Sequence, residues 1–220
     1  PVFVPRGFQP APVRNGMPNM AVPPPQVASN QDPMRQLKQT ITALKSDEAS
    51  FESTIGPLTQ SLLNVVDEQQ IRKVIEEIFS QSIQISTFRY NGAKLCHYLS
   101  SNLTNQYPSG TFRQLLLKRC HEEHNKYSTL TDNCDTRRHM IGFTLFLGEL
   151  LLNLKDNQGD KLTVLVGALN QLLAAFLQQP TDENLRHIVQ VLKLCGVHLD
   201  DGSSPVLDQI FDKFKEVTVA

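Results

Sequence analysis

The sequence contains one dense group of side chains that could bind a metal ion. Residues 120–124 read Cys-His-Glu-Glu-His, and Cys134 and His139 follow. His121 and His124 are three residues apart, so a helix would place them on one face. A zinc protease needs its two histidines four residues apart, however, and the cysteine spacing matches no common zinc module. We therefore expect a charged, exposed helix end that runs into a polar loop, with no metal and no other cofactor.

Glu149 is a second candidate for chemistry, because it lies within the apolar run that begins at Phe146. A single acid without an evident partner is weak support for catalysis. We expect it to face water or to pair with an arginine across a helix contact. The sequence also lacks a P-loop, a GxSxG string and a dinucleotide-binding glycine pattern. It predicts a protein that is not an enzyme and has no small-molecule substrate.

Basic residues gather in two places that could contact an acidic partner or RNA. These residues are Arg113, Lys118 and Arg119 in the first place, and Arg137 and Arg138 in the second. A solvated helix face is the alternative, because acidic residues lie close by in the sequence. The 21 Lys and Arg and the 22 Asp and Glu give a net charge of −1, so no global basic field indicates a nucleic-acid-binding protein.

The elements that would position these residues are helices. From residue 34 on, apolar residues recur with a period of about 3.6, and no segment shows sustained strand alternation. We expect helices at 34–45, at 50–66 with a kink or break at Gly56-Pro57, from Asp67, and from about 91. Further helices follow the Pro108-Ser-Gly turn, span 133–155, run from a cap at Asp160 to Pro180, start at a cap at Thr181, and carry Pro205 in the first turn. Gly142 and Gly148 fall inside the long helix, where their missing side chains would let a neighbouring helix approach.

Grouped in twos, these helices form about four pairs that start near residues 50, 91, 132 and 182. Helical hairpins that repeat every 40–50 residues or so are typical of HEAT-type solenoids. The sequence therefore predicts an all-α fold, a HEAT-type helical-hairpin solenoid in the form of an α-α superhelix. Such a fold offers long surfaces and seldom hosts catalysis, so it favours a scaffold.

The first 33 residues differ from the rest, since they hold nine of the 13 prolines. We expect a disordered, proline-rich leader before one folded domain at 34–220. No run of about 18 apolar residues is present, so no membrane span is expected. The four cysteines lie far apart without a CxxC string, which favours reduced thiols and a cytoplasmic location.

Three strings, in order and with helical spacing, resemble the middle domain of initiation factor 4G. They are Phe88-Arg-Tyr-Asn-Gly-Ala-Lys-Leu-Cys-His-Tyr-Leu-Ser100, Phe112-Arg-Gln-Leu-Leu-Leu-Lys-Arg-Cys120 and Phe146-Leu-Gly-Glu-Leu150. Ser50-Phe-Glu-Ser and Leu192-Lys-Leu-Cys-Gly196 strengthen the resemblance, which covers residues 34–220. This HEAT-repeat module occurs in several translation and RNA-processing proteins.

The resemblance implies a translation-initiation coactivator that bridges poly(A)-binding protein, the initiation factor 4A helicase and initiation factor 3, and so promotes mRNA circularisation. Phe3, Val4 and Pro5 resemble the second half of a short motif that docks on poly(A)-binding protein, roughly Leu-Asn-x-x-Ala-x-x-Phe-x-Pro. The first half is absent, so we expect weak binding through this motif. The family domain continues with at least one more helix, so we expect this one to be truncated at its C-terminal end.

Two alternatives remain open at this point. One is a middle-domain adaptor of another mRNA pathway, such as the nuclear cap-binding complex, histone mRNA or decay. The other is a module that binds RNA directly through Arg113, Lys118, Arg119, Arg137 and Arg138.

Overall fold

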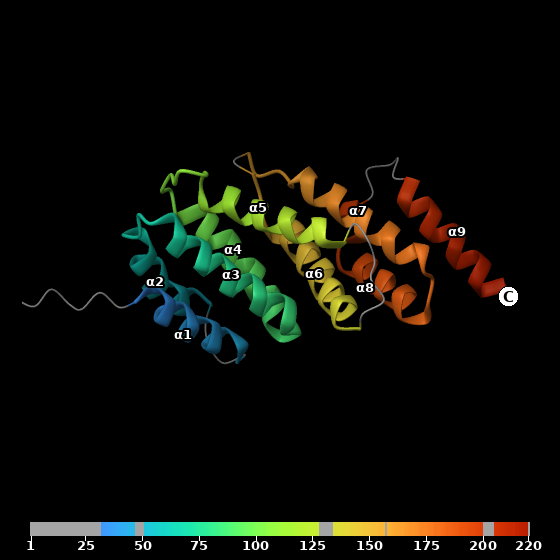
Figure 1. The fold of residues 1–220 in the computed structure, drawn as a ribbon, viewed down its shortest axis with the longest axis horizontal. Helices are drawn as coiled ribbons and strands as arrows, with labels where there is room; N and C mark the ends of the chain where they lie inside the picture. Colours follow the sequence, from blue (N-terminus) through green and yellow to red (C-terminus); the bar gives the residue numbers. More distant parts are fainter. Residues whose placement is uncertain (1–31, 47–50, 128–133, 157, 200–204, 220) are drawn as a thin grey trace, which may run out of the picture. The chain divides into compact units, whose positions relative to one another are not determined.

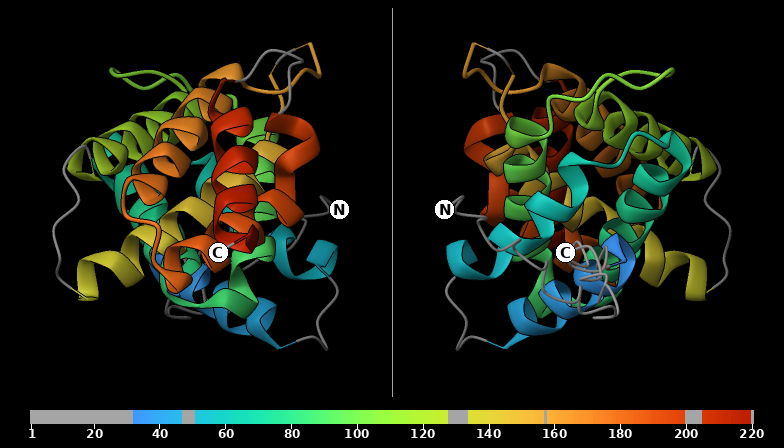
Figure 2. Two further views of the ribbon diagram at one scale, coloured as in Figure 1. Left: turned by 90° about the vertical axis from the view of Figure 1, so that its right-hand side faces the viewer. Right: turned by 90° about the vertical axis from the view of Figure 1, so that its left-hand side faces the viewer.

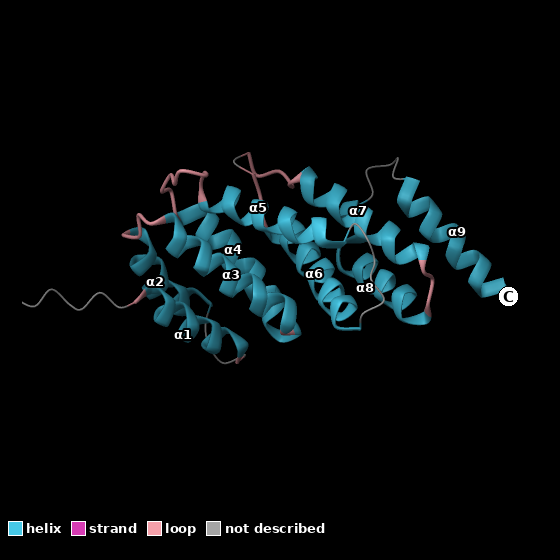
Figure 3. Cartoon of the chain, viewed as in Figure 1, coloured by secondary structure: helices cyan, strands magenta, loops and turns pink. Residues whose placement is uncertain are grey.

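Helices make up most of the folded part of the chain (Figures 1 and 3). The computed structural model describes residues 32–46, 51–127, 134–156, 158–199 and 205–219. The helices there are α1 (Pro33–Lys45), α2 (Phe51–Leu63), α3 (Glu68–Gln84), α4 (Ser86–Asn102), α5 (Phe112–His124), α6 (Cys134–Asn153), α7 (Thr163–Gln178), α8 (Asp182–Leu199) and α9 (Pro205–Val219), with a 3-10 turn η1 (Asn125–Tyr127) after α5. Apart from two isolated β-bridges, this described part contains no strand, which confirms the predicted all-α fold.

Several helices begin where the sequence predicts a cap. Asp67 accepts a hydrogen bond from the backbone N–H of Gln69 at the start of α3, and the Thr181 hydroxyl accepts one from the N–H of Asn184 in α8. Thr111 and Gln114 form a reciprocal capping box that fixes the start of α5. Pro205 opens α9 as predicted.

Asp160 does not cap α7, so that part of the prediction is wrong. The backbone N–H of Asp160 donates to the Asp156 carboxylate, and the N–H of Asp156 donates to the carbonyl of Asp160. This turn holds Asp160 before the helix, and Leu162 takes the N-cap position without a side-chain hydrogen bond.

Two other boundaries differ from the sequence-based expectation. α2 ends at Leu63 rather than near 66, and it continues through Pro57 as one helix, so the break allowed for at Gly56-Pro57 does not occur. α4 begins at Ser86 rather than near 91, and Ile85 alone separates it from α3.

The helices pack in hairpins whose phase differs from the predicted one. α1 packs against α2, α3 against α4, and α7 against α8. The predicted pairs were α2 with α3, α4 with α5, α6 with α7, and α8 with α9. α4 does contact α5 and α6 does contact α7, but α2 packs against α1, and α8 packs against α6 and α7. The reason is the one-residue link at Ile85, since so short a link folds α4 back onto α3.

The hairpins stack so that α6 contacts α4 on one side and α8 on the other, in one row (Figure 1). In the other row α3 packs against α5, and α7 against α9. Figure 2 looks along the stack from its two ends, so that successive helices lie one behind another. This arrangement agrees with the predicted HEAT-type solenoid, and it leaves one side of α5 and α7 toward solvent.

The core between the rows is aromatic at its centre and closely packed at α6. Phe79 of α3 meets Phe143 and Phe146 of α6, with ring centroids 5.8 Å apart in both pairs. A Cβ on Gly142 would collide with the backbone carbonyl oxygen of Ile83, and one on Gly148 would lie 2.8 Å from Leu194 Cδ2. Both glycines therefore permit close approach of a neighbouring helix, as expected from the sequence.

Candidate functional site

The Cys-His-Glu-Glu-His string forms the end of α5, and the helix divides it between two faces. Cys120, His121 and His124 face α7, whereas Glu123 turns into a cluster of charged groups on another side. His139 joins Glu123, with its Nε2 atom 3.1 Å from the carboxylate; the side chain of Cys134 lies outside the described residues. Among the described residues, no group of three or more His, Cys, Asp or Glu side chains could hold a metal ion.

Glu123 is the centre of an ionic network, which we call the Glu123 cluster. Its side chain is only 3% exposed. The partners that share its two carboxylate oxygens are Arg119 at 2.8 Å, Lys126 at 2.8 Å, the Tyr127 hydroxyl at 2.8 Å and His139. Arg119 also binds Glu76 of α3 at 2.6 Å and lies over the ring of Phe79, 4.2 Å from its centroid. The cluster therefore ties α3, α5, η1 and α6 together.

The electrostatics of this cluster match a structural role. Burial by itself would raise the pKa of Glu123, but hydrogen bonds from Lys126, Arg119 and Tyr127 outweigh it and lower the pKa to about 2. Burial and the bond to Glu123 raise the pKa of Tyr127. At neutral pH the glutamate is thus a fixed anion and the tyrosine a fixed donor, so neither is poised for proton transfer.

Glu149 has the arginine neighbour that the sequence leads us to expect. Burial raises its pKa, and the charge of Arg89 in α4 opposes that rise. Arg89 itself donates to the backbone carbonyls of Ser82 and Ile83 at the end of α3. The charge of Arg89 therefore acts on Glu149 across the contact between α4 and α6.

The five basic residues named above do not share one environment. Arg119 belongs to the Glu123 cluster, Arg113 donates to the carbonyl of Lys155 at 3.1 Å, and Arg137 lies 3.8 Å from Glu183. Lys118 and Arg138 are exposed. Three of the five side chains thus contact other parts of the fold, and two are exposed. Phe3, Val4 and Pro5 lie outside the described residues.

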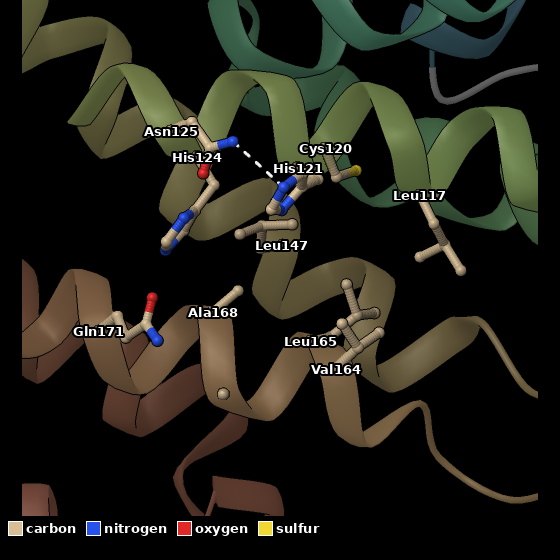
Figure 4. A pocket seen from close by; sticks show the side chains of 11 residues that line it. Leu117, Cys120, His121, His124, Asn125, Leu147, Val164, Leu165, Ala168 and Gln171 are labelled. Carbon is tan, nitrogen blue, oxygen red and sulfur yellow. Dashed lines mark hydrogen bonds between the residues drawn. The ribbon is translucent and has the colours of Figure 1, made fainter. Parts of the chain in front are cut away.

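The structure has a groove between α5 and α7 that the sequence analysis does not identify (Figure 4). We call it the α5–α7 groove, and its volume is about 360 Å³. One wall is made by Leu117, Cys120, His121, His124 and Asn125. Leu147 of α6 and the α7 residues Val164, Leu165, Gly167, Ala168 and Gln171 complete it.

The groove is apolar, and a few polar groups point into it. Figure 4 shows His121 and His124 pointing from α5 toward α7, with a hydrogen bond of 3.1 Å between Asn125 Nδ2 and His121 Nε2. His124 Nε2 is buried and has no hydrogen-bond partner in the described part of the chain. Burial raises the pKa of the Cys120 thiol to about 12, so it is neither a thiolate ligand nor a nucleophile at neutral pH. This chemistry suits recognition rather than catalysis.

One signal in the sequence could have indicated the groove. The 16 residues of α7 include no charged residue, although the helix has a solvent-facing side. Helices on the surface of a globular protein ordinarily carry charges on that side. A helix without them has a face that a partner could cover.

Comparisons with known proteins agree with the resemblance noted above. A family model described as the MIF4G domain matches residues 35–218. Polyadenylate-binding protein-interacting protein 1 of Xenopus laevis is 37% identical to this chain over 165 residues. The alignment covers 72% of this chain and 36% of the relative, so the chain matches little more than a third of that protein's length.

Across the described residues, none of the helices is long and apolar enough to cross a membrane.

Proposed function

Because this chain belongs to the MIF4G domain family, we propose that it is a non-enzymatic adaptor of translation initiation in the cytoplasm. Its partners in this proposal are poly(A)-binding protein, the initiation factor 4A helicase and initiation factor 3. By holding them together it would promote mRNA circularisation and translation. The observation that carries the proposal is the family match over residues 35–218 together with a relative named for its interaction with polyadenylate-binding protein.

The described structure is consistent with this role. The α5–α7 groove and the exposed ends of stacked helices offer surfaces to other proteins, whereas the buried ionisable groups of the Glu123 cluster are engaged with one another. A leader that tethers a second site would raise the effective concentration of a partner at the folded domain.

The decisive experiment is a binding measurement with purified partners. The full chain is titrated by calorimetry with the helicase, with and without nucleotide, and with poly(A)-binding protein. Saturable binding to both supports the adaptor. If a folded chain, checked by circular dichroism, binds neither of them, the proposal fails.

Variants can separate the surfaces in this experiment. Phe3→Ala with Pro5→Ala removes the docking motif and should affect poly(A)-binding protein alone. Lys118→Glu and Arg138→Glu reverse the charge of exposed side chains, so they leave intact the hydrogen bond of Arg113 and the ion pairs of Arg119 and Arg137.

Direct RNA binding through the basic residues is a second candidate for the same charged surface. In an anisotropy titration with single-stranded RNA, binding that weakens steeply as salt rises, and that Lys118→Glu and Arg138→Glu reduce, would favour it.

A further inference from the structure

The sides of α4, α6 and α8 that point away from the other row form one surface, which we call the α4–α6–α8 face. α6 packs against α4 and against α8, so it lies between them (Figure 1). α4 also packs against α3 and α5, α6 against α3 and α7, and α8 against α7. The opposite sides of these three helices are therefore turned to the same side of the molecule.

On α6 this face is an apolar strip that contains one acid. It consists of Arg138, Ile141, Leu145, Glu149 and Leu152, which recur every three or four residues along one side of the helix. The three aliphatic side chains pack against the core and are still only half-buried. From Ile141 to Leu152 the strip is about 16 Å long, which is about three turns of a helix.

The helices on both sides of this strip place cations beside it. Lys94 lies on the side of α4 opposite its buried residues, and Arg186 and Lys193 lie on the corresponding side of α8. Arg138 adds a fourth cation at the start of the strip itself. Three of these side chains are exposed and Lys94 is half-buried, so all four can contact a partner.

Acidic residues are scarce on the same three helices. α4 contains no Asp or Glu, and after their first turns α6 and α8 contain only Glu149. The charge of Arg89 already acts on that carboxylate. The acid on the face therefore has a cation of its own and does not balance the four others.

Those four cations have weak partners or none within the described part of the chain. No carboxylate there forms a salt bridge with Lys94, Arg138 or Lys193. Arg186 lies 4.0 Å from Asp182, but both side chains are highly exposed, so this contact contributes little. The α4–α6–α8 face thus has a net positive charge.

Lys94 is held in place at the edge of the face by aromatic rings. Its Nζ atom lies 4.3 Å from the ring centroid of Phe51 and 5.6 Å from that of Tyr90. Tyr90 is itself 53% exposed. A cation that is already positioned loses less conformational freedom when a partner binds.

The apolar part of the face distinguishes between two kinds of acidic partner. Single-stranded RNA is held by phosphate contacts and by stacking of its bases on aromatic rings. The centre of this face is aliphatic instead, and Val197, on the same side of α8 as Lys193, is 87% exposed. A ligand that covers these side chains and meets the cations is a peptide with both apolar and acidic residues.

We propose that the α4–α6–α8 face binds an acidic, amphipathic helix of a partner protein. The helix lies along α6, and its apolar side chains pack on Ile141, Leu145 and Leu152. Packed helices lie about 8–10 Å apart, so its carboxylates reach Lys94 on one side and Lys193 on the other. This interaction is additional to the contacts of the proposed adaptor and does not depend on which protein supplies the helix.

The test selects the ligand without assuming its sequence. A library of random 16-residue peptides displayed on phage is first depleted on Lys193→Glu and then selected on the full chain, so that peptides bound elsewhere are removed. The enriched peptides are synthesised, and their affinities are measured by fluorescence anisotropy.

Two matched controls accompany the variants of the face. Lys73→Glu reverses the charge of an exposed lysine of α3, in the other row, and so matches Lys193→Glu. Leu177→Ala shortens a half-buried leucine of α7 and so matches Leu145→Ala. Circular dichroism melting curves establish that all four proteins are folded.

We expect the enriched peptides to have a net negative charge and apolar residues three or four positions apart. Their affinity should fall about fivefold or more in Lys193→Glu and in Leu145→Ala, and change by less than about twofold in either control. If no peptide is enriched, if the enriched peptides are neutral or basic, or if the controls weaken binding as much as the variants of the face, the proposal is wrong.

A single-stranded RNA of 20 nucleotides is titrated in parallel at low and high salt. If RNA binds and Lys193→Glu weakens that binding, while no acidic peptide is enriched, the face belongs to RNA and the proposal is overturned.

Discussion

Glu123 is charged and yet lies in the interior, because several neighbours share its two carboxylate oxygens. Removing one member of a buried ionic network leaves the remaining charges uncompensated, which costs more than the network contributes as a whole. We expect Glu123→Gln to lower the free energy of unfolding by about 2–4 kcal/mol, measured by urea denaturation at pH 7. Glu122→Gln, its exposed neighbour, should change it by less than about 0.5 kcal/mol.

The loss of unfolding free energy in Glu123→Gln should depend on pH and become smaller as the pH falls. Its pKa is about 2 in the folded protein and about 4.3 in an unfolded chain. The contribution of the charge is therefore complete above about pH 4.3 and disappears as the pH falls toward 2. If the difference between the two proteins stays constant down to pH 2, the carboxylate is not held as described.

His187 affects stability at a higher pH. It is 2% exposed, its ring lies 4.6 Å from that of Phe176, and burial lowers its pKa to about 4. An unfolded histidine has a pKa of about 6.5, so between pH 6.5 and 4 the unfolded state binds the proton and the folded state does not. We expect this residue to cost up to about 3 kcal/mol of stability over that interval. In His187→Leu, the urea concentration at the midpoint of unfolding should vary less with pH between 6.5 and 4. If it varies with pH as steeply as in the original chain, the assignment to His187 is wrong.

For single residues, the sequence can predict that a charged side chain in an apolar segment needs a partner. It does not show which distant residues the fold brings close to that side chain. The sequence predicts that Glu149, within an apolar run, faces water or pairs with an arginine, and the charge of Arg89 does act on it. Glu123 and Arg119 look like ordinary residues of a solvated helix face in the sequence. Their burial depends on Glu76, 43 residues before Arg119, and on Phe79, which only the packing of α3 on α5 brings close.

Among the elements, α6 depends most on small residues. Gly142→Ala would push a methyl group into the backbone carbonyl of Ile83, which cannot move without shifting the end of α3. We expect a loss of roughly 1–3 kcal/mol. Gly148→Ala meets the end of the Leu194 side chain, which can turn away, so its cost should be smaller.

Gly167→Ala is the matched substitution in open space. Nothing lies within 4 Å of the added methyl group, and alanine favours a helix over glycine by roughly 0.5–1 kcal/mol. We expect this variant to unfold at a higher urea concentration than the original chain. If all three substitutions have the same effect, helix propensity rather than close packing governs them.

The positions of the helices are largely predictable, because apolar residues recur along the sequence with the period of a helix and mark its buried face. The exceptions have local causes. The start of α4 is hidden because a single residue, Ile85, separates it from α3 without Gly or Pro. Asp160 has the right residue type for a cap, but the turn made by Asp156 holds it before the helix. The phase of the hairpins follows from that short link, which periodicity alone does not show.

At the scale of the whole molecule, we expect α9, at the end of the stack of hairpins, to unfold without the helices at the centre. α9 contacts α7 through buried Leu207 and Ile210, whereas Phe146 lies at the centre of the α3–α6 contact. In a solenoid each unit interacts mainly with its neighbours, so damage at the end should not spread far.

Hydrogen–deuterium exchange with mass spectrometry would measure this difference. Ile210→Ala should speed exchange in α9 and the adjoining part of α7, and leave α3, α4 and α6 protected. Phe146→Ala should speed exchange in all the helices from α3 to α8. Uniform acceleration in Ile210→Ala would indicate that the helices unfold together as one cooperative unit.

The buried thiols make the timing of such openings measurable by chemical labelling. Cys96, Cys120 and Cys195 are buried and free, and they belong to α4, α5 and α8, respectively. Burial raises the pKa of each thiol, so none reacts with a thiol reagent until the helices around it separate. With Cys134 replaced by serine, the rate of labelling at each remaining cysteine would report how often its part of the stack opens.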